Sequence, residues 1–197
     1  SDVYKRQTLL SALILVCGML PDMILPILVA PLIDKGGKKK WIVGLDILLA
    51  TVYAAMGIWI TGHAFSYGLY VGFTLVVGTI SVFYRLAFDA WYPSLIPVGA
   101  EQRGYSVSAT LYPLVTILMA PVATFLYSHV PMGTLFLVVS GLTVLSCLVE
   151  GCIREVRKAA EEAYTFRQYR SDIRAGFAFL KREKGIRNIY TLSLIHI

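Results

Sequence analysis

The sequence predicts an all-α polytopic membrane protein. Of its 197 residues, 57% are hydrophobic and only 15% are charged. A soluble domain of this length could not bury so much apolar surface. The apolar residues gather into five runs, each long enough to cross a bilayer core of about 30 Å as a helix. The runs are residues 8–33, 41–62, 67–92, 106–128 and 132–153.

Positive charge lies almost entirely on one side of the predicted spans. The four lysines of the loop at residues 31–41, here called the lysine loop, follow the first span. Arg103 follows the third span and many basic residues follow the fifth, whereas the connections 61–67 and 128–133 carry no Lys or Arg. The positive-inside rule therefore predicts a cytoplasmic lysine loop. Because this topology explains the basic balance, no nucleic-acid partner is expected.

Tryptophans lie near the ends of the predicted spans. Trp41, Trp59 and Trp91 occupy such positions, where indole rings commonly anchor a helix at the membrane surface. The expected localisation is therefore the cytoplasmic membrane, crossed several times, with the lipid bilayer as a partner.

The two ends of the chain are expected to differ in origin from the rest. Residues 192–197, LSLIHI, can be encoded CTG TCT CTT ATA CAC ATC, and the reverse complement of that string translates as DVYKRQ, residues 2–7. Such complementary ends resemble one inverted transposase recognition sequence, of the kind used in sequencing-library preparation. We therefore expect residues 1–7 and 192–197 to be artefacts, and residues 8–191 to be a fragment of a longer chain.

Residues 8–153 are predicted to form an incomplete transmembrane bundle. A cytoplasmic lysine loop means that the first visible span is entered from outside, so an earlier helix is expected and the five spans would be the second to sixth of six. Residues 154–185 are expected to be a cytoplasmic amphipathic linker, and residues 186–191 the start of another span. The linker's apolar residues recur at three- and four-residue steps; a helix lying on the lipid surface is the alternative. These apolar residues are Phe166, Tyr169, Ile173, Phe177 and Leu180.

The lysine loop also carries an acid and two glycines that orientation alone does not require. Residues 30–42, APLIDKGGKKKWI, resemble the loop signature of the major facilitator superfamily, G-x-L-a-D-r-x-G-r-k-x-x-l, with Ala30 where the family has Gly. The resemblance implies two six-helix bundles joined by a basic linker, and hence a missing C-terminal half of the same chain. It also implies that the loop is a conformational gate in which Asp34 accepts hydrogen bonds at a helix N-terminus of that half. The gate residues are Asp34, Lys35, Gly37, Lys38 and Lys39.

Other similarities point to the drug-efflux-like branch of that superfamily. Residues 89–97, DAWYPSLIP, are similar to its connection between the fourth and fifth helices, and residues 171–189 are similar to its linker. Residues 116–124, TILMAPVAT, resemble the antiporter signature G-x-x-x-G-P-x-x-G. Small residues in such a signature allow close helix packing. Its members here are Thr116, Ala120, Pro121 and Thr124, in which the two threonines and the alanine replace glycines.

A polar stripe runs along the span at residues 67–92. Its residues are spaced by 4, 3, 4 and 4 positions, so they share one helical face. Ionisable groups inside a span usually face a partner or a wet cavity, and we predict that this stripe lines a cavity. The alternative is an Arg85–Asp89 pair at i,i+4 that only supports packing. The stripe consists of Thr74, Gly78, Ser81, Arg85 and Asp89.

Asp22 is a second candidate. It precedes the lysine loop by about eleven residues, which places it about 16 Å along a helix and so near mid-membrane. A carboxyl group there suits proton carriage; the alternative is a carboxylate held by a structural partner near Pro21. Asp46 and Glu150 lie near cytoplasmic span ends and are expected to pair with lysine or arginine.

These observations predict a secondary active transporter rather than an enzyme. The acids are scattered and the histidines at 63 and 129 lie in outer loops, so no catalytic residue, metal or cofactor is expected. The predicted activity is alternating-access transport of a small molecule, in the form of proton-coupled efflux by resemblance. The alternatives are a membrane-embedded enzyme and a metabolite uptake facilitator of the same superfamily.

Overall fold

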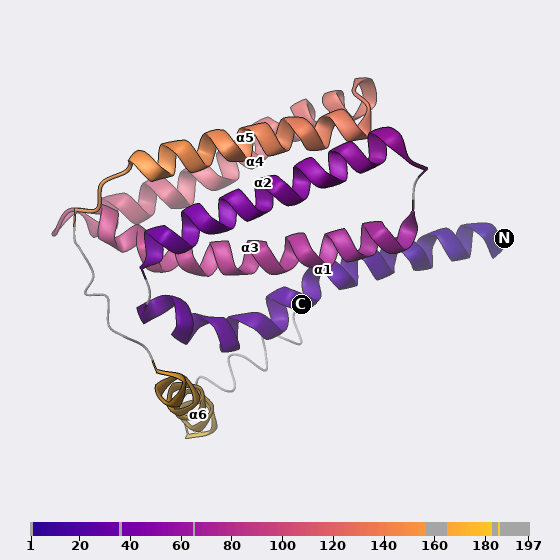
Figure 1. The fold of residues 1–197 in the computed structure, drawn as a ribbon. Coiled ribbons are helices and arrows are strands. Elements are labelled where there is room, and N and C mark those ends of the chain that lie inside the picture. The colour runs from indigo at the N-terminus through magenta and orange to yellow at the C-terminus, as the bar shows by residue number, and fades with distance from the viewer. Residues whose placement is uncertain (1, 36, 65, 157–164, 183–184, 186–197) are drawn as a thin grey trace.

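The computed structural model describes residues 2–35, 37–64, 66–156, 165–182 and 185. All regular secondary structure within those ranges is α-helical (Figure 1). The helices are α1 (Asp2–Lys35), α2 (Lys38–Gly62), α3 (Tyr67–Leu95), α4 (Glu101–His129), α5 (Met132–Cys152) and α6 (Phe166–Arg182).

Within the described ranges, four helices, α2 to α5, are long and apolar enough to cross a membrane. They coincide with the second to fifth predicted runs to within a few residues, because polar or turn-forming residues end each run. The first run lies within α1, a single helix of 34 residues that contains Pro21, Pro26 and Pro31. The expected span start at residues 186–191 and the expected artefact at 192–197 lie outside the described residues.

The helices are not packed in the order of the chain. In Figure 1, α3 lies between α1 and α2, and α2 lies between α3 and α5. The most extensive contact joins α2 to α5, followed by α1 with α3. By contrast, α4 meets α5 only over a small area, and it has no buried residue.

A close crossing explains how α2 and α5 pack so extensively. Gly57 and Gly133 face each other there, and a Cβ atom added to Gly57 would lie 2.9 Å from the Gly133 carbonyl oxygen. A Cβ atom on Gly133 would meet the Thr61 hydroxyl. Farther along, the buried Ser140 hydroxyl donates a hydrogen bond of 2.7 Å to the Ala50 carbonyl. Small residues thus let two helix backbones approach, as they commonly do in membranes.

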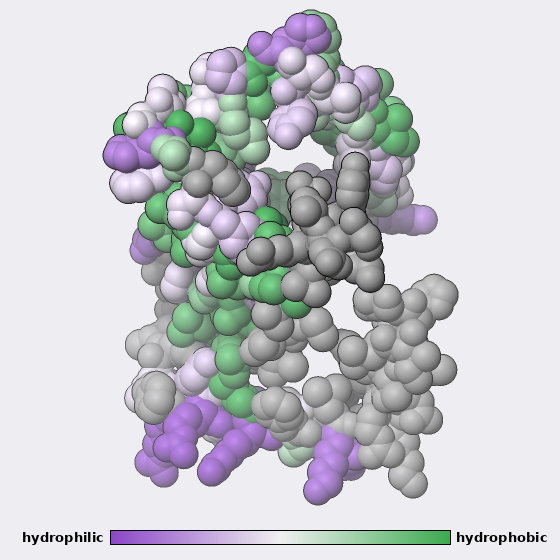
Figure 2. All heavy atoms as spheres, turned by 90° about the vertical axis from the view of Figure 1, so that its right-hand side faces the viewer, coloured by the Kyte–Doolittle hydropathy of each residue, from purple (hydrophilic) through white to green (hydrophobic). Residues whose placement is uncertain are grey.

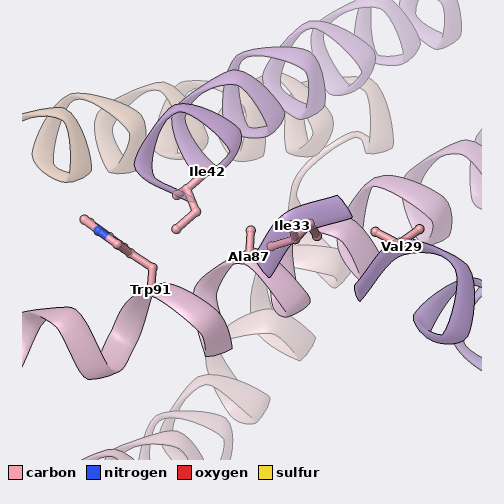
Figure 3. Close-up of a cluster of buried hydrophobic side chains, with 5 residues drawn as sticks. All are labelled: Val29, Ile33, Ile42, Ala87 and Trp91. Atoms are coloured by element: carbon pink, nitrogen blue, oxygen red, sulfur yellow. The ribbon is translucent and has the colours of Figure 1, made fainter. Parts of the chain in front are cut away.

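A cluster of buried hydrophobic side chains joins α1, α2 and α3 (Figure 3). Val29 and Ile33 come from α1, Ile42 from α2, and Ala87 and Trp91 from α3. Trp91 is only 1% exposed, so it is a core residue rather than the surface anchor that its position near a span end suggests. Its indole N–H donates a hydrogen bond of 2.7 Å to Glu155 Oε1, which satisfies the one polar atom of the buried ring.

Helix α6 lies outside the bundle of the other helices and contacts α1 over a small area (Figure 1). The Tyr169 hydroxyl donates a hydrogen bond of 2.9 Å to the Leu28 carbonyl of α1. Arg167, Arg170 and Arg174 are exposed on α6. Figure 2 shows strongly hydrophilic residues at the bottom of the molecule, the level at which α6 lies in Figure 1, below a band of hydrophobic residues.

Candidate functional site

An ion pair between α1 and α3 is the centre of the candidate site. Arg85 Nη2 lies 2.5 Å from Asp22 Oδ1. The two side chains are 56% and 45% exposed, respectively. The sequence singled out each residue for a separate reason, and the fold brings the two together across a helix interface. Asp22 therefore has a defined cationic partner.

The polar stripe on α3 divides into a packed part and an exposed part. Thr74 and Gly78 face α1: a Cβ atom on Gly78 would lie 3.0 Å from the Gly18 carbonyl oxygen, and one on Gly18 would lie 3.4 Å from Thr74 Cγ2. Ser81 and Asp89, by contrast, are exposed. The stripe thus packs against α1 at one end and reaches the surface, with Arg85, at the other.

Arg85 pairs with Asp22 rather than with its helical neighbour Asp89. Within the described part of the chain, Asp89 makes no ion pair. An i,i+4 pair needs no tertiary contact, whereas the Asp22 pair exists only because α1 lies against α3. The arginine therefore connects two helices.

At one end of the bundle, which we call the lysine end, α2 begins and α3 and α5 end. Gly37 precedes α2, and Lys38 and Lys39 form its first turn. The Lys39 ammonium donates two hydrogen bonds of 2.8 Å, to the carbonyl oxygens of Gly151 and Ile153 at the end of α5. A cation at a helix C-terminus satisfies free carbonyls and complements the helix dipole.

The other gate residues are described less fully. Asp34 and Lys35 belong to the last turn of α1, but their side chains lie outside the described residues. The role of the loop as a gate therefore stays a prediction.

A buried acidic cluster at the lysine end was not predicted. Asp46 of α2 and Glu150 of α5 are 4% and 8% exposed. Their carboxyl groups lie within hydrogen-bonding distance of each other, and the Tyr84 hydroxyl of α3 donates a hydrogen bond of 2.6 Å to Glu150 Oε1. The expectation that each acid pairs with lysine or arginine is therefore wrong. The sequence does contain a sign of this cluster: each acid falls inside an apolar run, where a charge needs a protein partner.

The antiporter-like residues lie on an exposed helix. Thr116, Ala120, Pro121 and Thr124 all face outward on α4. The two threonine hydroxyls donate to carbonyls four residues earlier in their own helix, Tyr112 and Ala120. The predicted packing role of this signature stays a prediction.

The chemistry that these groups offer is charge pairing and proton binding. In the part of the chain that the structure describes, no three His, Cys, Asp or Glu side chains converge as a metal site would need. The functional candidates are therefore the Asp22–Arg85 pair and the acidic cluster. Comparisons with protein-family models, with curated proteins and with solved structures find no match to this chain.

Proposed function

We propose that this chain is part of a secondary active transporter that exports a small molecule by alternating access, coupled to protons. The observation that carries the proposal is the Asp22–Arg85 ion pair. Charges on membrane-spanning helices are costly, and they usually mark a substrate or ion pathway. This pair lies between two helices, and both side chains are partly exposed. Such exposure would let a substrate or a proton replace one partner of the pair.

The exposed part of the α3 stripe supports the same proposal. Ser81 and Asp89 stand on the surface with Arg85, so three polar side chains border one open face. We propose that this face lines a cavity completed by a second bundle, the C-terminal half of a longer chain. The resemblance of the lysine loop to the major facilitator signature supports that arrangement.

The orientation belongs to the proposal as well. Lysines and arginines gather at the lysine end and on α6, which favours a cytoplasmic position for both in a cytoplasmic membrane. With that orientation α1 would be a fifth span, entered from outside and preceded by another helix. The exposed surface of α4 supports this proposal, since an additional apolar helix preceding α1 would cover it.

Transport by the complete reading frame tests the proposal. The host is a strain that lacks its own efflux pumps. Cells that express the protein should accumulate less dye than empty cells do, for at least one of three fluorescent dyes: ethidium, a neutral dye and an anionic dye. A protonophore should abolish the difference, and so should Arg85→Ala. Arg103→Ala is the matched control, because Arg103 is an exposed arginine near the start of α4.

The outcomes separate the alternatives. Accumulation above that of empty cells would favour a metabolite uptake facilitator. Dye levels equal to those of empty cells, for every dye and with normal membrane insertion, would count against export and return a membrane-embedded enzyme to consideration. In everted vesicles, Asp22→Asn should preserve dye binding but abolish dye-dependent proton movement.

A further inference from the structure

The acidic cluster places two carboxyl groups in the interior of a three-helix contact. Asp46 comes from α2 and Glu150 from α5, and α3 contributes Tyr84. Asp46 is 4% exposed and Glu150 is 8% exposed. Both carboxyl groups are therefore more than nine-tenths removed from solvent, and they lie within hydrogen-bonding distance of each other.

Each carboxyl group has one oxygen without a hydrogen-bond partner. These are Asp46 Oδ2 and Glu150 Oε2. The remaining Glu150 oxygen, Oε1, accepts the hydrogen bond from Tyr84. An ionised carboxylate can only accept hydrogen bonds, so two ionised carboxylates in contact cannot satisfy each other. A proton on one of them turns it into a donor.

Among the residues that the structure describes, no lysine or arginine is seen to form an ion pair with either acid. On α2, the Lys39 ammonium donates to the end of α5, at Gly151 and Ile153. On α3, Arg85 is paired with Asp22 of α1, and on α5 the Cys147 thiol lies 3.7 Å from the Val43 carbonyl. Tyr84 is the one titratable neighbour that donates to the acids among the described residues, and it is neutral at physiological pH.

We propose that Asp46 and Glu150 together bind one proton, which makes the contact of α2, α3 and α5 a protonation site. Two touching buried carboxyl groups cannot both be ionised without a large electrostatic cost. A shared proton removes one charge and lets one carboxyl group donate a hydrogen bond to the other.

The site has a consequence for helix packing that does not depend on transport. Loss of the proton places two anions in contact between α2 and α5, the most extensive helix pair in the fold. While the site is protonated, the assembled state binds one proton more than the dissociated state, in which both acids ionise. By linkage, the ratio of assembled to dissociated chain falls up to tenfold for each pH unit between the ordinary carboxyl pKa of about 4 and the midpoint of the site, and it levels off above that midpoint.

Infrared spectroscopy of the full chain in lipid vesicles tests the proposal directly. Exposed aspartates and glutamates are ionised at pH 7, so a C=O stretching band of a carboxylic acid at that pH reports a protected proton. We expect such a band in the wild type and its loss in Asp46→Asn, whose amide can donate to Glu150 in place of the proton. Asp172→Asn, on α6, is the control and should keep the band.

Three outcomes would overturn the proposal. The first is a wild-type spectrum without a carboxylic acid band at pH 7. The second is a band that persists unchanged in Asp46→Asn. The third is a band that disappears at fixed pH when Na⁺ or Ca²⁺ is added, because the pair would then bind a metal ion.

A second variant and a second measurement keep the test independent of folding defects in Asp46→Asn. Tyr84→Phe adds no polar atom and should move the band, since it removes the hydrogen bond to Glu150; an unmoved band would place the acid elsewhere. Unfolding by SDS should show wild-type stability that falls as pH rises. The fall should be absent in Asp46→Asn, and equal slopes for the two proteins would contradict the shared proton.

Discussion

Single side chains in this bundle connect helices that are far apart in the sequence. The Asp22–Arg85 pair joins α1 to α3 across 63 positions, and Lys39 joins α2 to the end of α5. Membrane interiors offer no water to satisfy polar groups that lose their partners. Each of these contacts should therefore be measurable by removing one partner at a time.

A double-mutant cycle should show coupling between Asp22 and Arg85. Asp22→Ala and Arg85→Ala should each destabilise the chain, because each leaves a charge unpaired. The double variant should lose less than the sum of the two, by about 0.5–3 kcal/mol. The measurement is unfolding by SDS, followed by circular dichroism.

Asp89 provides the control for that cycle. The pair Asp89→Ala and Arg85→Ala should give additive losses, since Arg85 is bonded to Asp22. If the coupling energy of Arg85 with Asp89 equalled its coupling energy with Asp22, the arginine would pair with both aspartates in turn.

Lys39→Met should destabilise the bundle although the lysine lies at its edge. The methionine keeps most of the apolar stem but cannot donate to the carbonyls of Gly151 and Ile153. Cations at helix C-termini contribute about 0.3–1 kcal/mol, and up to about 2 kcal/mol when partly buried. Lys38→Met is the matched control in the same turn, and unfolding by SDS should show a smaller loss for it.

The ionisable side chains of the candidate site could be predicted from the sequence, but their partners could not. Asp22 and Arg85 stood out because each is a charge inside an apolar run. Their pairing depends on α3 lying beside α1, which hydropathy does not encode. For the same reason Asp46 and Glu150 were assigned to basic partners, whereas the fold places them against each other.

The helices themselves follow closely from the sequence. Bounds predicted from apolar runs agree with α2 to α5 to within a few residues, because the cost of exposing backbone polar groups to lipid makes each run helical throughout. The neighbours of each helix were not predictable in this way. Close packing here depends on glycines such as Gly57 and Gly133, and a glycine looks the same in the sequence whether it faces a helix or lipid.

Gly133→Ala should weaken the contact of α2 with α5. The added methyl group would meet the Thr61 hydroxyl and lie 3.0 Å from the Gly57 carbonyl oxygen, so the helices must separate. Gly141→Ala, in the same helix, is the control, because a Cβ atom there has nothing within 4 Å. It should be neutral or stabilise the helix by up to about 1 kcal/mol.

Cross-linking can show directly whether α2 and α5 separate in Gly133→Ala. A disulfide between cysteines placed on α2 and α5 should form more slowly in Gly133→Ala than in Gly141→Ala. Equal rates would mean that the crossing adapts to a methyl group without separation.

On the scale of the whole molecule, the distribution of charge predicts one orientation in the membrane. Single cysteines can test it after the native Cys17, Cys147 and Cys152 are replaced. Val98→Cys lies at the lysine end, in the connection between α3 and α4, at a position that is 83% exposed. It should react with an impermeant maleimide only from the cytoplasmic side.

Ser66→Cys is its counterpart at the opposite end, where Ser66 precedes α3 and is exposed. It should react only from outside in intact cells. The reverse pattern would invert the proposed topology, and reaction of both cysteines from one side would mean that α3 does not cross the bilayer.

The hydrogen bonds of Lys39 also bear on the order of biosynthesis. Its two acceptors lie 112 and 114 residues later in the chain. At typical synthesis rates of about 5–20 residues per second, the ribosome needs roughly 6–23 s to make that stretch. During this interval α2 is in the membrane without its main partner, while α3 and α4 are still being inserted. The α2–α5 contact is therefore a late event, and a nascent chain that stalls before α5 would expose Asp46 without Glu150.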